Sequence, residues 1–182
     1  MVRLIMCKAL LYSLCILTVW ASVSAAQSAL PEEVEAQINA YMADYTPIPM
    51  PSPYSSLIEH VQIGCDASGK PMIGIAARTI ESFKPITGLV VVERTDEGFL
   101  LRKATFPDIA RIKNGKNRRK VQALTQSLHQ IPFQRTDEHP PIDGMSSATR
   151  YSAKALHYFN YMARTLAREL DERAAKETPE VP

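Results

Sequence analysis

Cysteine is scarce in this sequence, and the scarcity excludes several kinds of protein. Of three cysteines in 182 residues, Cys7 and Cys15 lie in an apolar N-terminal stretch, and only Cys65 lies beyond it. A chain that loses this stretch keeps one cysteine, which cannot form an intramolecular disulfide. The haem-attachment pattern Cys-x-x-Cys-His is also absent. We expect Cys65 to be a small buried residue of a strand.

Metal-ligand and hydrolase patterns are lacking as well. The four histidines, His60, His129, His139 and His157, show no paired ligand spacing, so we expect no metal site. Ser152 precedes His157 by five positions, which places the two side chains about 140° apart on a helix. The strained Gly-x-Ser-x-Gly turn of the α/β-hydrolases does not occur either. The sequence therefore does not predict a serine hydrolase.

An excess of charge of one sign is the third absence. The whole chain has a formal net charge of +2, and without its first 26 residues it keeps 19 basic against 19 acidic residues. A neutral chain has no general attraction to polyanions. We therefore expect no nucleic-acid partner.

The N-terminal stretch itself has the layout of a secretory signal peptide. Arg3 and Lys8 accompany an apolar run over residues 9–20, and small residues follow as far as Ala26. Cleavage after residue 25 or 26 would export the chain, most simply to the periplasm. An uncleaved membrane anchor is the alternative, although the run is shorter than the roughly 20 apolar residues of a bilayer span.

The rest of the chain predicts an α+β fold in which antiparallel β-hairpins pack with helices. Residues 31–45 are expected to form a helix, and four prolines in residues 46–53 make an extended connector that either tethers this helix loosely or wraps it along the domain. Two hairpins follow. Their strands are expected at residues 57–65 and 71–79, and at residues 88–95 and 99–105.

The C-terminal third is expected to contain helix. Residues 121–128 favour a short helix, and Pro132, Pro140 and Pro141 indicate a loop after it. A long amphipathic helix comes last. Its apolar stripe should dock on the sheet, and it consists of Ala155 or Leu156, Phe159, Ala163, Leu166 and Leu170.

These patterns divide the chain into four parts. They are a signal peptide (residues 1–26), a helix with the proline-rich connector (residues 27–56), one domain (residues 57–173) and a flexible tail (residues 174–182). Within the domain, residues 111–120 contain six basic residues and no acidic one. Such a segment is either a solvated face or a contact for an anionic ligand or partner.

Seven residues where the last loop turns into the long helix are the most specific feature. Ser146 is a good N-cap, which would make the next three residues the first of the helix, with backbone N–H groups that lack partners within it. The seven are Asp143, Gly144, Met145, Ser146, Ser147, Ala148 and Thr149.

This motif resembles the attachment site of the FMN-binding domain family, found in the sodium-pumping NADH:quinone reductase and related electron-transport proteins. The family pattern is Asp-x-x-[Ser/Thr]-[Gly/Ser]-Ala-[Thr/Ser], and Ser147 stands where Gly is commonest. Similarity of organisation extends over roughly residues 61–170. The resemblance implies that a flavin transferase, with FAD as the FMN donor, links FMN through its phosphate to the Thr149 hydroxyl.

The resemblance also gives roles to the neighbours of Thr149. Asp143 would orient the loop or the acceptor, and the small residues Gly144, Ser147 and Ala148 would leave room for the transferase. Arg150 would neutralise the phosphodiester, which the positive end of the helix dipole also favours by roughly 0.3–1 kcal/mol. The flavin phosphate is one candidate target of the basic segment, residues 111–120.

The function expected from these features is that of an exported electron carrier with covalent FMN, rather than a stand-alone enzyme. Its redox donor and acceptor are unidentified and can be membrane-bound. The alternative is an exported binding or scaffold module without flavin, which would use the basic segment or the proline-rich connector to contact a partner.

Overall fold

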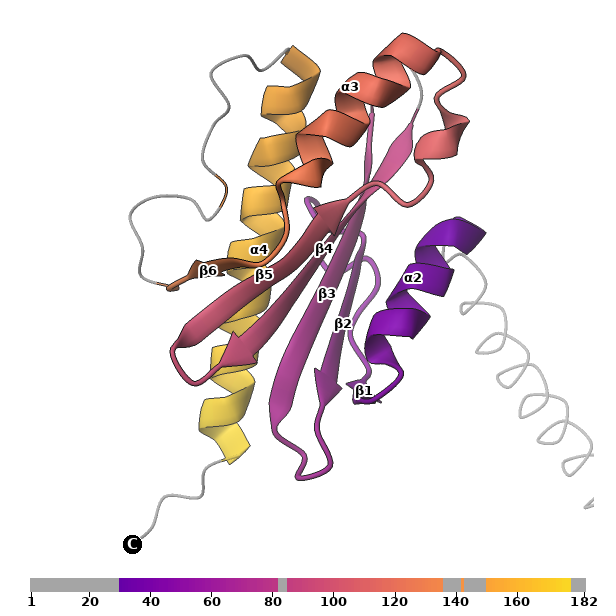
Figure 1. Cartoon of the computed structure of the whole chain (residues 1–182). Helices are drawn as coiled ribbons and strands as arrows, with labels where there is room; N and C mark the ends of the chain where they lie inside the picture. Colours follow the sequence, from indigo (N-terminus) through magenta and orange to yellow (C-terminus); the bar gives the residue numbers. More distant parts are fainter. Residues whose placement is uncertain (1–29, 82–84, 136–141, 143–149, 178–182) are drawn as a thin grey trace, which may run out of the picture.

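The fold is a six-stranded antiparallel sheet with helices on both faces (Figure 1). The computed structural model describes residues 30–81, 85–135, 142 and 150–177. The expected α+β class is confirmed. The strands are β1 (Thr46–Ile48), β2 (His60–Cys65), β3 (Pro71–Ile80), β4 (Ile86–Thr95), β5 (Gly98–Thr105) and β6 (Ile131–Phe133). The helices are α2 (Glu32–Met42), the short 3-10 helix η2 (Ile109–Arg111), α3 (Gly115–Gln126) and α4 (Arg150–Glu177).

The strands lie in the sheet in the order in which they occur in the chain. Short turns explain this for the two expected hairpins, β2–β3 and β4–β5, which are both confirmed. In the first turn the Asp66 carboxylate accepts the Ser68 backbone N–H at 2.8 Å, and Gly69 takes a φ of +90°, which side-chain-bearing residues rarely adopt.

The two central strands are apolar on both sides because helices cover both faces of the sheet. Along β4, Leu89 and Val91 face α2, whereas Val90 and Val92 face α4, and all four are fully buried. Side chains alternate between the two faces of a strand, so a continuous apolar run is what a doubly covered strand requires.

The first helix, α2, covers one face. Its side chains Val34, Ile38 and Met42 are buried against β3 and β4. Pro31 precedes the helix, and three acidic residues in the first turn suit the positive end of the helix dipole. This part of the chain follows the sequence-based expectation closely.

Three details go beyond the sequence analysis. The connector wraps along the domain, because β1 pairs with β2 and Ile48, Met50 and Tyr54 pack against the larger apolar cluster. The interpretation of Pro132 as a loop residue is wrong. It lies in β6, where an edge strand tolerates the missing N–H. The last helix continues to Glu177, past residue 174, where the flexible tail was expected to begin.

Candidate cofactor-attachment site

The long helix α4 is the support of the candidate site. Its apolar stripe is buried against β3 and β4, as expected, through Ala155, Leu156, Phe159, Ala163, Leu166 and Leu170. The helix approaches the sheet closely at Gly88, where an added Cβ would lie 2.9 Å from Phe159 Cε1. Close packing of this kind fixes the position of the N-terminal half of α4 relative to the sheet.

The motif lies between Ile142, which is anchored to α4, and Arg150, where α4 begins. Ile142, immediately before Asp143, is 2% exposed. Its backbone N–H donates to Asn160 Oδ1 at 2.9 Å, and its carbonyl accepts from Asn160 Nδ2 at 3.0 Å. One side-chain amide of α4 therefore satisfies both backbone groups of Ile142. On the other side of the motif, Arg150 is the first residue of α4.

The candidate site residues themselves lie outside the described residues. This applies to Asp143, Gly144, Ser146, Ser147, Ala148 and Thr149, and to the side chain of Arg150. The expected N-cap at Ser146 falls in the same segment. The structure thus describes what flanks the motif on both sides and the helix that follows it.

A cluster of two cations and one ring lies on the N-terminal half of α4. The guanidinium carbon of Arg78, from β3, lies 4.1 Å from the centre of the Tyr158 ring, and Lys154 Nζ lies 6.0 Å from it. Arg78 Nη1 also donates to the Ser56 carbonyl at 3.3 Å. Arg78 Nε is buried and has no hydrogen-bond partner within the part of the chain that the structure describes. Such an orphaned donor is costly to bury and can be satisfied by a bound acceptor.

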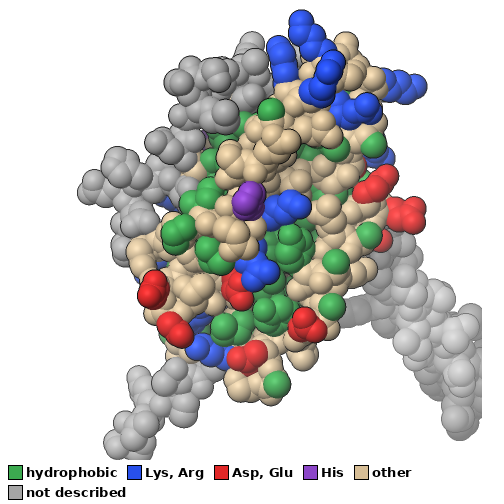
Figure 2. Space-filling model, in the orientation of Figure 1, with side chains coloured by type: hydrophobic (Ala, Val, Ile, Leu, Met, Phe, Trp, Pro, Cys, Tyr) green, Lys and Arg blue, Asp and Glu red, His purple; other side chains and the backbone are tan. Residues whose placement is uncertain are grey.

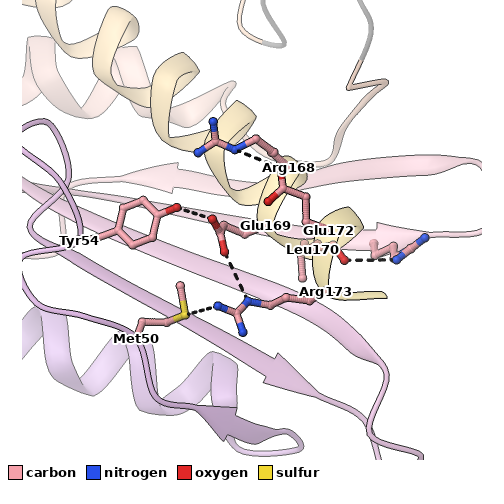
Figure 3. A network of polar contacts seen from close by, with 8 residues as sticks. Met50, Tyr54, Arg168, Glu169, Leu170, Glu172 and Arg173 are labelled. Carbon is pink, nitrogen blue, oxygen red and sulfur yellow. Dashed lines mark hydrogen bonds and ion pairs between the residues drawn. The ribbon is translucent and has the colours of Figure 1, made fainter. Parts of the chain in front are cut away.

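The C-terminal half of α4 is held by the proline-rich connector (Figure 3). The Tyr54 hydroxyl donates to Glu169, whose other oxygen pairs with Arg173 Nε at 3.4 Å, and Arg173 also contacts Met50 Sδ at 3.1 Å. Burial of the hydroxyl, followed by its hydrogen bond to Glu169, raises the pKa of Tyr54. The phenol therefore remains a proton donor to Glu169 throughout the neutral pH range.

Comparison with protein-family models, with curated proteins and with solved structures finds no match. The resemblance to flavin-carrying domains therefore rests on the seven residues of the motif and on the order of hairpins and helix in the sequence. Within the described ranges, no helix is long and apolar enough to cross a membrane. The same ranges contain no group of three or more His, Cys, Asp or Glu side chains that could hold a metal ion.

Sequence reasoning missed three side chains around the N-terminal half of α4: Asn160, which binds Ile142, and Arg78 and Lys154, which lie against the Tyr158 ring. Asn160 carried a local signal, because an amide on the flank of an apolar helix usually has a specific hydrogen-bond partner. Arg78 carried none, since its approach to Tyr158 depends on how β3 and α4 pack. Tyr158 itself is half-buried beneath Arg78.

Proposed function

We propose that this chain is an exported flavoprotein electron carrier that holds FMN through a phosphoester on Thr149. The observation that carries the proposal is the bracketing of the motif by the Asn160-bound backbone of Ile142 and by the start of α4. Asn160 of α4 holds Ile142, and α4 itself begins at Arg150, so one well-packed helix fixes the described positions on both sides of the acceptor segment before a transferase binds.

The attachment reaction needs one hydroxyl and one anhydride. Thr149 Oγ attacks the FMN phosphorus of FAD, the bond to the AMP phosphate breaks, and AMP leaves with the hydroxyl proton passed to the products. The transferase would supply the base for that step. The chain gains the mass of FMN less one water, and the new phosphodiester carries one negative charge.

The described residues fit such a group. Arg78 and Lys154 supply positive charge, Tyr158 supplies an aromatic face, and the buried Arg78 Nε is a donor that still lacks an acceptor. Along α4, Tyr158 lies eight positions after Arg150, which is about 12 Å of helix. These side chains would hold the flavin near the sheet and partly screen it from water. Bound FMN itself would supply the redox chemistry, since it accepts electrons singly or in pairs.

The test is the mass and fluorescence of the denatured protein isolated from its native host, or from a strain that also expresses a matching flavin transferase. We expect a mass increase equal to FMN less one water and a fluorescent band. Thr149→Ala should lose both, whereas Thr149→Ser keeps a hydroxyl and should retain them. Covalent flavin that persists in Thr149→Ala would place the attachment elsewhere.

Unmodified protein from the native host would favour the rival function, a binding or scaffold module without flavin. The same experiment separates the two, because the rival predicts equal masses for wild type and Thr149→Ala. Protein made without a transferase serves only as the unmodified standard.

A further inference from the structure

The basic segment forms a surface at one end of the molecule. Its six cations belong to η2, to the loop after it and to the first turns of α3, and Figure 2 shows Lys and Arg side chains gathered over α3. Five of them are exposed and Arg118 is half-buried. We call this set the basic surface: Arg111, Lys113, Lys116, Arg118, Arg119 and Lys120.

The cations of this surface are largely unbalanced. Arg111 pairs with the buried carboxylate of Asp108 at 3.5 Å, and Asp108 also accepts the backbone N–H of Thr87 at 2.9 Å. The other five have no carboxylate partner within 4.0 Å among the described residues. Ion pairing with the described part of the fold therefore does not account for their presence.

Their position on α3 is unfavourable for the helix itself. Asn114 caps the helix by accepting the N–H groups of Lys116 and Asn117, at 3.0 and 3.1 Å, but the first turn contains no acidic residue. Cations at the positive end of a helix dipole destabilise it slightly. The sequence of α2 follows the opposite rule, with Glu32, Glu33 and Glu35 in its first turn. An anionic partner would relieve the repulsion in α3.

The N-terminal end of α3 also has a hollow in which an anionic group can approach Arg118 and Arg119. A depression of about 630 Å³ is lined by Arg118 and Arg119 together with Ile109, Ala110, Gly115 and Gln122. At Gly115 an added Cβ would meet no atom within 4 Å, so the backbone of the first turn is openly accessible. Guanidinium groups beside an accessible helix N-terminus are well suited to a phosphate oxygen.

The composition of the surface distinguishes between macromolecular partners. Stable protein interfaces usually contain buried aromatic or apolar anchors, and single-stranded nucleic acids stack on aromatic side chains. Residues 111–120 contain no aromatic residue, and the exposed large hydrophobic residue found in the described chain is Tyr161 of α4, at 37% exposure. A bilayer needs neither anchors nor shape complementarity, and clusters of four to eight Lys and Arg residues are typical of anionic lipid contacts.

We propose that the basic surface docks the protein onto a membrane that contains anionic phospholipids. Residues 27–182 have no net charge, so the molecule as a whole is not attracted to an anionic membrane. The cations gathered on the basic surface would instead turn that surface toward the lipid. The N-terminal ends of α3 and α4 lie at the same end of the molecule (Figure 1). Docking would therefore bring the start of α4, at Arg150, toward the lipid surface, whether or not flavin is attached.

Co-sedimentation with vesicles tests the proposal without flavin. Both apolar clusters consist of residues 34–170, so a chain that starts at Gln27 keeps every residue of the fold and lacks the apolar N-terminal run. At low salt we expect it to bind vesicles of 30% phosphatidylglycerol and 70% phosphatidylcholine, and not vesicles of phosphatidylcholine alone. Binding should fall steeply in 0.5 M NaCl.

The double variant Lys116→Gln, Arg119→Gln should bind the anionic vesicles about tenfold more weakly or worse. It should fold normally, because both side chains are exposed and removing cations from this end of the helix relieves repulsion. Lys70→Gln, Lys176→Gln removes the same charge at the opposite end of the molecule and should bind like the wild type. Equal binding of the two double variants, equal binding to neutral vesicles, or binding to single-stranded RNA with none to vesicles would overturn the proposal.

Discussion

The two faces of the sheet are built differently, although a helix covers each. Among the described residues, the apolar cluster under α4 contains 25 buried residues drawn from the sheet, α3, α4 and several loops, whereas the cluster under α2 contains eight. Polar contacts follow the same division. Asn160 and Glu169 tie α4 to Ile142 and to the connector. The α4 face therefore carries both the stability of the domain and the flanks of the candidate site.

The α2 face has the smaller buried cluster, and two of the three buried side-chain atoms that lack a hydrogen-bond partner among the described residues lie on it, the third being Arg78 Nε on the α4 side. His60 begins β2 on this side, and its Nε2 atom is buried without a hydrogen-bond partner among the described residues, as is Gln37 Oε1 of α2. Small clusters with unsatisfied polar groups are the parts of a domain that open first. From this difference we expect α2 to detach from the sheet more readily than α4, so that the α4 face remains folded while α2 is open.

Phe159→Ala and Ile38→Ala test this difference with the largest expected effects. Phe159 of α4 is fully buried between Gly88 of β4 and Phe106, so its truncation should lower the free energy of unfolding by about 3–5 kcal/mol. Ile38 is a residue of α2 on the side that faces the sheet, and it is 4% exposed. Its truncation should accelerate hydrogen exchange of α2 amides far more than that of α4 amides. Urea unfolding and hydrogen exchange give the two measurements, and equal acceleration of both helices by Ile38→Ala would contradict the distinction.

Asn160→Ala sharpens the comparison on the α4 side. It removes both hydrogen bonds to Ile142 and should cost about 1–2 kcal/mol of stability. If the bracketing of the motif prepares Thr149 for the transferase, the fraction of flavin-bearing chains should fall as well. Mass spectrometry measures that fraction. Asn160→Asp keeps an acceptor for the Ile142 N–H but turns a carboxylate oxygen toward the Ile142 carbonyl, so it should not restore wild-type stability. Asn117→Ala, on the exposed face of α3, is the control for a lost surface amide.

Local patterns in the sequence predicted most of the fold. Alternation and turn residues predicted both hairpins, and helical spacing predicted the buried stripe of α4. They did not predict β6, because a three-residue edge strand that contains Pro132 has no periodicity to detect. The course of the connector was also left open, since it depends on Tyr54 reaching Glu169, 115 positions away in the sequence.

The sequence also predicted only part of the candidate site. The motif could be found from the sequence because its seven residues are contiguous. Its supports could not, because Arg78 comes from β3 and meets Tyr158 of α4 only through tertiary packing. Contacts between distant segments depend on the register of the whole sheet, which no local pattern encodes.

The smallest expected effect concerns pH on the α2 face. Burial lowers the pKa of His60 below its usual value near 6.5, and this outweighs the hydrogen bond to Gln62 and the charge of Glu35, which both act in the opposite direction. As the pH falls through 6.5, the unfolded chain therefore takes up this proton before the folded chain does, and stability is lost until the pH is below the folded pKa. His60→Gln should flatten the fall in unfolding free energy between pH 7 and pH 5, as measured by urea denaturation at each pH. His129→Gln, at the exposed end of α3, is the matched control, and a slope unchanged in His60→Gln would show that the α2 face tolerates the charged imidazole.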